Sequence, residues 1–503
     1  MESSSDRIFA NLVQWITRSP ASGGIVHESL AMRGDGSARG VFARNRISKG
    51  DTLVALPADL AVSGSNLPIS YGDRSASSWL RCIGAYYRAR QDSDRFQPYF
   101  DSLPTVYDSL LNWTDDEVAI YLSGTSLCSL ALQDREGKVL GTRYQEAVRP
   151  YLEHLGLMLS SDSDSQGMDY FREACMCVST RGFHLEQSAS NSLYSGPFLL
   201  PLIDLLNHDP IRKCTTLTYT DGVFLMKAER DIEAEEEVCH SYDMKLTSTQ
   251  VLQTFGFVPE SSIDAAERSV RVGDHITPAV LSKLEVVTAC QGVIESSFPA
   301  EVRSYMESSQ THRNEESWDL EVDVSARDLS FLPDDFIVSC SYPLSAELIT
   351  LCCTLFLPLD IYSEFMASGA ALLERNMLDD YFLGKLVCKA IYDAVVAKVL
   401  TYSPIKILGL GVPLHRCNDD TALLRLIRHK PDLQRAVFGL TVRLEEKFCL
   451  LALRSDITYV SKCLGGIQLS NKSLGVIVHC CDSNSKEGGE PSEKKAKFAL
   501  TSS

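Results

Sequence analysis

The most constraining feature of this sequence is a series of short apolar runs between Phe198 and Phe257. Two of these runs, both rich in apolar and β-branched residues, flank Asp221-Gly222, a dipeptide that strongly predicts a two-residue β-hairpin turn. Farther on, Thr247-Ser-Thr-Gln250 has the spacing of a helix capping box, and Gly256 is well placed to end a short helix. The stretch therefore predicts a compact unit of strands and one short helix.

Polar side chains interrupt the ends of these apolar runs. Asp204, Asn207 and His208 lie at the end of the run that starts at Pro201, and Tyr242 ends a further predicted strand after the hairpin. Polar groups at such positions are poor core material, because burial without a hydrogen-bond partner costs free energy. We therefore interpret Asp204, Asn207, His208 and Tyr242 as candidates for one site.

The same stretch resembles the C-terminal half of a SET methyltransferase domain, in which Asn-His follows an apolar strand and a later strand ends in Tyr before Gly-Phe. The resemblance is to SET proteins of the Rubisco large-subunit methyltransferase class. It implies an α+β fold, with a β-rich SET fold interrupted by a helical insert and followed by an all-helical C-terminal domain. It also implies an S-adenosylmethionine-dependent protein-lysine N-methyltransferase.

An earlier segment is similar to the opening of a SET domain. Ser37-Ala-Arg39-Gly40-Val-Phe-Ala43 and Ile47–Pro57 are two β-type runs joined by a Lys-Gly-Asp turn, which predicts an antiparallel pair. The resemblance implies that Arg39 and Gly40 contact the cofactor through main-chain groups. The alternative for Gly40 is an ordinary glycine at the start of a strand.

Between these two β-rich pieces the sequence predicts helices. Apolar residues recur at helical spacing in Trp79–Arg90, Thr114–Leu132 and Arg143–Leu155, and a further helix is expected at Tyr170–Val178. Ser160–Gly167 is polar and is predicted as a loop. A helical insert in this place matches the architecture of the family.

The resemblance also implies roles near the cofactor. Arg181 is expected near the carboxylate of S-adenosylmethionine, a role that suits a planar cation with several donors, and a structural ion pair with a nearby Glu is the alternative. Asn207 and the main chain of His208 are expected to contact the cofactor, including the adenine edge. Asp204 matches an acidic position near the cofactor and could equally brace the local turn.

Tyr242 is the predicted catalytic residue, and it is also expected to contact the cofactor. A lysine amine has a reference pKa of about 10.4 and must lose a proton before it attacks a methyl group. A phenol can orient that amine, whereas general base catalysis would need a lowered pKa, so we assign orientation and electrostatics to Tyr242 first. Phe183 and Phe255 are expected to bind substrate as walls of the lysine channel, although Phe183 is equally suited to a core.

Two departures from the family pattern leave other functions open. Many relatives have Asn where this chain has Ser248, and Tyr where it has Phe255. The alternatives are a SET-like scaffold with weak or no catalysis that binds a protein partner, and a methyltransferase that acts on a protein histidine. The departures could also change how many methyl groups are added.

The remainder of the chain is predicted to be helical. Apolar stripes at helical spacing occur in Pro278–Phe298, Leu344–Leu355, Met377–Leu400 and Asp420–Leu453, with an exposed loop expected at Glu307–Asp319. The expected division is the N-terminal part of a SET domain (1–75), a helical insert (76–176), the C-terminal part of the SET domain (177–260), a helical substrate-binding-like domain (261–480) and a disordered tail (481–503).

The amino-acid composition indicates which classes of binding partner and which cellular compartments we expect. The net charge of −18 over 503 residues disfavours direct binding to nucleic acid and is compatible with a basic protein substrate, although an acidic surface can also simply aid solubility. The scattered cysteines indicate reduced thiols in a cytoplasmic or nuclear protein, and their spacing predicts no metal site. No apolar run is long enough to span a membrane, and we expect a monomer.

Overall fold

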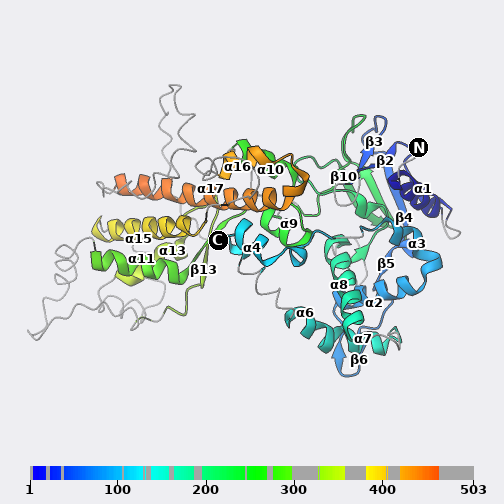
Figure 1. The fold of residues 1–503 in the computed structure, drawn as a ribbon, viewed down its shortest axis with the longest axis horizontal. Helices are drawn as coiled ribbons and strands as arrows, with labels where there is room; N and C mark the ends of the chain where they lie inside the picture. Colours follow the sequence, from blue (N-terminus) through cyan, green and yellow to red (C-terminus); the bar gives the residue numbers. More distant parts are fainter. Residues whose placement is uncertain are drawn as a thin grey trace, which may run out of the picture.

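The computed structural model describes residues 4–18, 23–34, 39–104, 107–128, 131, 138–157, 164–185, 195–243, 246–268, 276–296, 327, 329–356, 381–403, 405 and 420–463. The predicted loop at 307–319 and the predicted tail from 481 lie outside these ranges. Figure 1 shows an elongated molecule with most of the strands at one end and a group of long helices at the other. The named strands pair in antiparallel fashion and the helices lie in groups between and after them, so the fold is α+β as predicted.

The largest sheet is antiparallel and has the strand order β1-β4-β11-β10, formed by β1 (Ile25–Val26), β4 (Thr52–Pro57), β11 (Val223–Ala228) and β10 (Thr215–Thr220). The predicted hairpin between β10 and β11 is confirmed. Its turn residues, Asp221 and Gly222, have φ angles of 51° and 79°. Positive φ at both central residues is the property of a type I′ turn, for which Asp-Gly is a favoured dipeptide.

The predicted pairing of the two opening β-type runs is wrong. β3 (Gly40–Ala43) pairs with an upstream strand, β2 (Leu30–Arg33), in the register Arg33↔Gly40. The second run forms β4, whose two edges are occupied by β1 and β11. Both edges of β4 are therefore satisfied by strands from elsewhere in the chain, which a local turn signal cannot reveal.

Smaller strand groups complete the β-rich part. They are the sheet β5-β9-β8, formed by β5 (Val62–Ser63), β9 (Phe198–Leu199) and β8 (Gly182–Phe183), and the pair β6 (Ser70–Tyr71) with β7 (Arg74–Ser75). The strand predicted to end at Tyr242 is not formed as such. In its place an isolated parallel bridge joins His208 to His240, two residues before the tyrosine.

The helices of the first half include α1 (Ser4–Thr17), α2 (Ser78–Gln91), α3 (Ser93–Ser102), α4 (Asp115–Tyr121), α6 (Lys138–Arg143), α7 (Arg149–His154) and α8 (Asp164–Arg181). A π-helical turn at Tyr144–Val148 joins α6 to α7. The prediction of a loop at Ser160–Gly167 is wrong for its second half, because α8 begins at Asp164. A carboxylate in the first turn interacts favourably with the helix dipole, so a polar run here can start a helix.

Helix α9 (Ser248–Phe255) has the predicted beginning and end. Thr247 and Gln250 form both bonds of the capping box, and Gly256 follows the helix with φ of 83°. Helix α10 (Glu260–Arg268) comes directly after it. Local sequence signals therefore determine the position of α9 along the chain.

The C-terminal half is mainly helical and contains α11 (Lys283–Ser296), α13 (Ala346–Phe356), α15 (Tyr381–Leu400), α16 (Asp420–Ile427) and α17 (Gln434–Cys463). The prediction that it is all helical is wrong, because β12 (Ala279–Ser282) pairs with β13 (Asp335–Val338). Both strands alternate between buried and more exposed residues, and this period of two is that of a strand. Among the helices of the described ranges, none combines the length and the hydropathy needed to cross a membrane.

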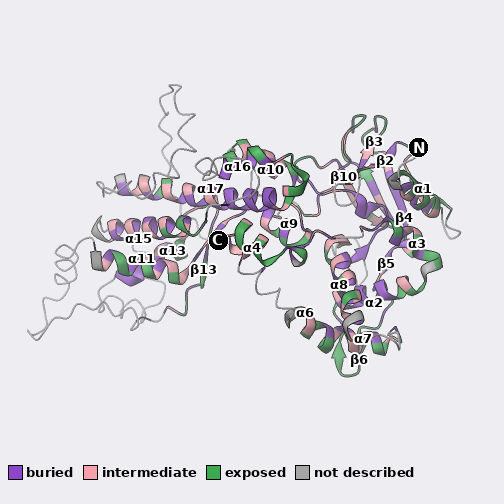
Figure 2. Ribbon diagram, viewed as in Figure 1, coloured by how far each residue is buried: buried purple, intermediate pink, exposed green. Residues whose placement is uncertain are grey.

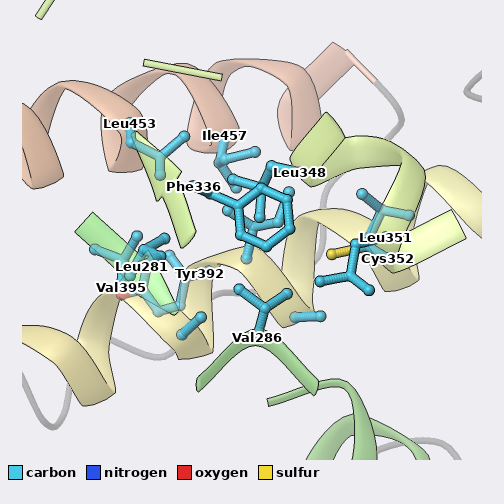
Figure 3. Packing of buried hydrophobic residues seen from close by; sticks show 14 of the residues in the cluster. Leu281, Val286, Phe336, Leu348, Leu351, Cys352, Tyr392, Val395, Leu453 and Ile457 are labelled. Carbon is cyan, nitrogen blue, oxygen red and sulfur yellow. The ribbon is translucent and has the colours of Figure 1, made fainter. Parts of the chain in front are cut away.

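Helix α17 runs from the helical end of the molecule to its middle, where it lies beside α16 and α10 (Figure 1). Residues near its start, such as Val437 and Leu440, share a hydrophobic cluster with residues of α4, α9 and α10. Residues farther along, such as Leu453 and Ile457, belong to a separate core with α11, α13 and α15, which Figure 3 shows in close view. Buried residues accordingly occur along most of α17 in Figure 2. One helix therefore contributes to two hydrophobic cores.

Candidate functional site

The candidate site is a cleft of about 330 Å³ between the β-rich part, α9 and the beginning of α17. Its lining includes seven of the nine predicted site residues: Arg39, Arg181, Asp204, Asn207, His208, Tyr242 and Phe255. Another side is closed by residues of α10 and α17, including Glu260 and Phe438, and by Arg428, which follows α16. Segments that are far apart in the sequence therefore meet at one cleft.

Asn207 is held in a defined orientation. Its Nδ2 donates to the main-chain oxygen of Arg39 at 3.0 Å and to Oε1 of Glu237 at 2.8 Å. A Cβ atom added at Gly40 would lie 2.5 Å from the same Glu237 oxygen and 2.9 Å from the Asn207 nitrogen. A side chain at position 40 is therefore disfavoured by contacts within the protein itself.

Two guanidinium groups and one buried carboxylate lie together at the back of the cleft. Arg181 donates to the main-chain oxygen of Asp204 at 2.7 Å, and Tyr99 donates to Oδ2 of Asp204 at 2.8 Å. Burial raises the pKa of Asp204, and Arg181 opposes this change. Burial and the neighbouring charge of Arg181 lower the pKa of Arg39 to about 10. Arg181 thus contacts Asp204, rather than the nearby Glu considered from the sequence.

His208 supports Tyr242. The main-chain amide of Tyr242 donates to Nδ1 of His208 at 3.0 Å, and the two rings stack with their centroids 4.9 Å apart. The Tyr242 hydroxyl donates to the main-chain oxygen of Leu206 at 2.9 Å. Burial raises the pKa of Tyr242 well above its usual value, so the phenol is neutral at physiological pH. This favours the orienting role over that of a general base.

Comparison with known proteins identifies the domain that holds this cleft. The family model described as the SET domain matches residues 38–243, a range that runs from Arg39 to Tyr242. Residues 38–243 of this chain are therefore similar to a SET domain. The match covers the strands from β3 to β11, the helical insert and the Asn207-His208 motif.

The curated proteins that this chain matches include lysine methyltransferases. Ribosomal lysine N-methyltransferase 4 of Saccharomyces cerevisiae is 27% identical over 252 residues, which cover 44% of this chain and 50% of that protein. The chloroplastic [fructose-bisphosphate aldolase]-lysine N-methyltransferase of Arabidopsis thaliana is 25% identical, with coverage of 53% and 57%. This chain therefore spans about half the length of these curated relatives.

Solved structures share the fold over nearly the whole chain. A structure of Rubisco LSMT bound to AdoMet has a TM-score of 0.55 and 16% sequence identity, and the match covers 96% of this chain and 98% of that one. A structure of Rubisco LSMT bound to sinefungin and monomethyllysine has a TM-score of 0.55 and 17% identity. At these identities the likeness establishes the fold, including the helical C-terminal half.

Phe183 and Phe255, the two residues predicted to form walls of the lysine channel, occupy different positions relative to the cleft. Phe255 lines the cleft, and its ring centroid is 4.8 Å from that of Tyr242. Phe183 is half-buried, stacks on His240 at 6.0 Å and meets Tyr242 edge-on at 6.4 Å, but it is not among the cleft-lining residues. Both rings therefore surround Tyr242, and only Phe255 does so from within the cleft.

Ser248 lies away from the cleft. Its hydroxyl donates to Oε1 of Glu445 on α17 at 2.8 Å, so this departure from the family pattern lies at a contact with the C-terminal helix. Sequence reasoning also missed Tyr99 and Glu237. Tyr99 comes from the helical insert, and no local signal indicated its contact. Glu237 directly precedes the predicted strand that ends at Tyr242, and a charged residue at this boundary could have drawn attention to it.

Proposed function

We propose that this chain is an S-adenosylmethionine-dependent protein-lysine N-methyltransferase. The observation that carries the proposal is the position of Tyr242, a neutral and anchored phenol in the same cleft as Asn207 and the two arginines. The lysine methyltransferase names of the curated relatives support it.

The cleft suits the charged end of the cofactor. Nη2 of Arg39 and Nε of Arg181 are buried without a hydrogen-bond partner among the residues that the structure describes. Two cations face the single carboxylate of Asp204, so the back of the cleft has an excess of positive charge. A bound carboxylate, such as that of S-adenosylmethionine, would offset this charge and accept the remaining N–H groups. We propose that Arg39 and Arg181 hold it.

When bound, S-adenosylmethionine supplies an electrophilic methyl group on a sulfonium. The role of this chain is to place a neutral lysine amine in line with that group, since displacement depends on alignment. Because the Tyr242 hydroxyl donates its hydrogen to Leu206, its oxygen can accept an N–H of the amine and orient the nitrogen lone pair. The apolar ring of Phe255, which lines the cleft, disfavours the protonated amine by desolvation.

We propose a protein substrate, as the relatives' names indicate for those enzymes. The net charge of −18 favours a basic one by electrostatic steering. We further propose that the chain acts as a monomer in the cytoplasm or nucleus, and that residues 261–480 contribute to substrate binding. Helix α17 supports this last point, because its Val437 and Phe438 line the cleft.

The test is transfer of a tritiated methyl group to a protein extract, followed by mapping of the modified residue. Tyr242→Phe should abolish transfer, at least about 100-fold, because the amine loses its acceptor. S-adenosylmethionine binding, measured by titration calorimetry, should persist. Tyr219→Phe is the matched control, since Tyr219 lies on β10 and is not among the cleft-lining residues.

Each possible result separates the candidate functions. Unchanged transfer by Tyr242→Phe would refute the role of this residue. Binding of the cofactor without transfer by the unaltered protein would favour a scaffold, and no binding would exclude the proposed cofactor. A modified histidine in the substrate would replace the lysine assignment.

A further inference from the structure

We propose that Glu237 is a positioning residue that orients the amide of Asn207, so that this amide offers the cofactor only its oxygen. The inference rests on the proposed function. It gives a role to an acidic side chain that the SET-domain motif described above does not include.

The hydrogen bonds of Asn207 are the basis of this inference. An amide nitrogen carries two hydrogens, and the Asn207 nitrogen donates to Glu237 and to the main-chain oxygen of Arg39. Both donors are therefore used within the protein. The expected contact of Asn207 with the cofactor is thereby limited to its Oδ1, which accepts an N–H.

The Glu237 carboxylate allows only this orientation of the Asn207 amide. An ionised Glu accepts hydrogen bonds and donates none, as does a main-chain carbonyl. If the Asn207 amide were reversed, its oxygen would face the Glu237 carboxylate and the Arg39 carbonyl, two acceptors at close range. Leaving buried acceptors opposed and unpaired is costly, so the reversed orientation is disfavoured.

The surroundings of Glu237 hold its carboxylate in place. The side chain is 18% exposed, and Arg212 donates to its second oxygen at 3.3 Å. The next residue, Val238, is fully buried, and its amide donates to the main-chain oxygen of Val41 at 2.7 Å. An isolated bridge pairs Glu237 itself with Phe42. The carboxylate is therefore fixed by the strand on which Gly40 also lies, and the missing Cβ of Gly40 provides its space.

The experiment measures S-adenosylmethionine binding by titration calorimetry and steady-state kinetics of the full chain. Glu237→Met removes the acceptor and should weaken cofactor binding about 10-fold or more, the usual effect of losing a hydrogen bond to a charged group. Glu237→Gln keeps an acceptor oxygen and should bind within about 3-fold of the unaltered protein. The turnover number at saturating cofactor should change little in either variant, because Glu237 acts through Asn207.

A neighbouring glutamate provides the matched control. Glu236 pairs with Arg230 and does not line the cleft, so Glu236→Met should leave cofactor binding unchanged.

A second variant tests the inference if Glu237→Met fails to fold. Asn207→Asp places an oxygen against Glu237 and should lose binding, and adding Glu237→Gln should restore part of it, because the Gln amide can donate to the new carboxylate.

The outcomes are distinct. Cofactor binding by folded Glu237→Met equal to that of the unaltered protein would overturn the inference, as would equal losses in Glu237→Met and Glu237→Gln. Failure of Glu237→Gln to improve the Asn207→Asp variant would also overturn it. If the unaltered protein binds no S-adenosylmethionine, the proposed function itself fails.

Discussion

The free energy of unfolding of this protein should depend on pH through Glu445, a residue of α17 that contacts α9. This side chain is buried in the middle of α17, accepts from the Ser248 hydroxyl at 2.8 Å and accepts from the Thr277 amide at 2.9 Å. Burial raises its pKa to about 7, although both hydrogen bonds oppose the change, and the adjacent Glu446 raises it further. Glu445 therefore retains its proton in the folded protein at pH values where the unfolded chain has lost it.

The size and sign of the effect follow from this difference. The ordinary value of 4.5 and the raised value of about 7 differ by an amount that corresponds to about 3 kcal/mol, at about 1.4 kcal/mol for each pH unit. The folded state binds the proton more tightly, so protonation favours folding. This contribution is complete below pH 4.5 and is lost as the pH rises from 4.5 through about 7.

The assay compares the free energy of unfolding of the unaltered protein and Glu445→Gln by urea denaturation between about pH 5 and pH 8.5. A Gln at this position has the same shape and can accept from Thr277 while donating to the Ser248 hydroxyl, but it does not titrate. We expect the unaltered protein to lose about 2 to 3 kcal/mol relative to the variant as the pH rises across this range. Titrating groups that do not interact with Glu445 contribute equally to both proteins and cancel.

A control variant tests whether the effect belongs to this site. Glu347→Gln removes an exposed carboxylate on α13 and should give a curve parallel to that of the unaltered protein. If Glu445→Gln is also parallel to the unaltered protein, Glu445 is ionised in the folded state and the reasoning from burial is wrong.

Two further predictions concern backbone geometry and a buried imidazole. Gly256→Ala should lower the free energy of unfolding by more than about 2 kcal/mol, since a Cβ would lie 2.0 Å from the Asp108 oxygen, whereas Gly222→Ala, which has open space and a similar φ, should cost only about 1 kcal/mol; equal losses in urea denaturation would contradict this. His240 should remain neutral down to about pH 5 in an NMR titration, because burial and Lys213 lower its pKa to about 4, and this lowered value removes stability as the pH falls below 6.5. A midpoint near 6.5 would show that the ring is solvated.

Local signals in the sequence were sufficient for several elements. Asp221-Gly222 predicted the β10–β11 hairpin, and Thr247 with Gln250 predicted the beginning of α9. In each case the residues that determine the conformation are neighbours in the chain. The SET resemblance then placed the Asn207-His208 motif in the right part of the fold.

Prediction from the sequence failed for strands whose pairing partners are distant in the chain. The opening runs pair with β2, β1 and β11 instead of with each other, because which strands share a sheet depends on the whole arrangement. The β12–β13 pair was missed for the same reason, since its two strands are separated by more than fifty residues. A short apolar run can form either a strand or a helix until its partner is known.

By itself, the sequence determined the turns, the helix caps and the residue types of the cleft, since these depend on interactions within a few residues. Only the tertiary structure decided which groups meet there: Tyr99 with Asp204, Glu237 with Asn207 and Ser248 with Glu445. The physical reason is that hydrogen bonding and burial act through space. They set the protonation of Tyr242 and Glu445 and the orientation of the Asn207 amide without any signal in the neighbouring sequence.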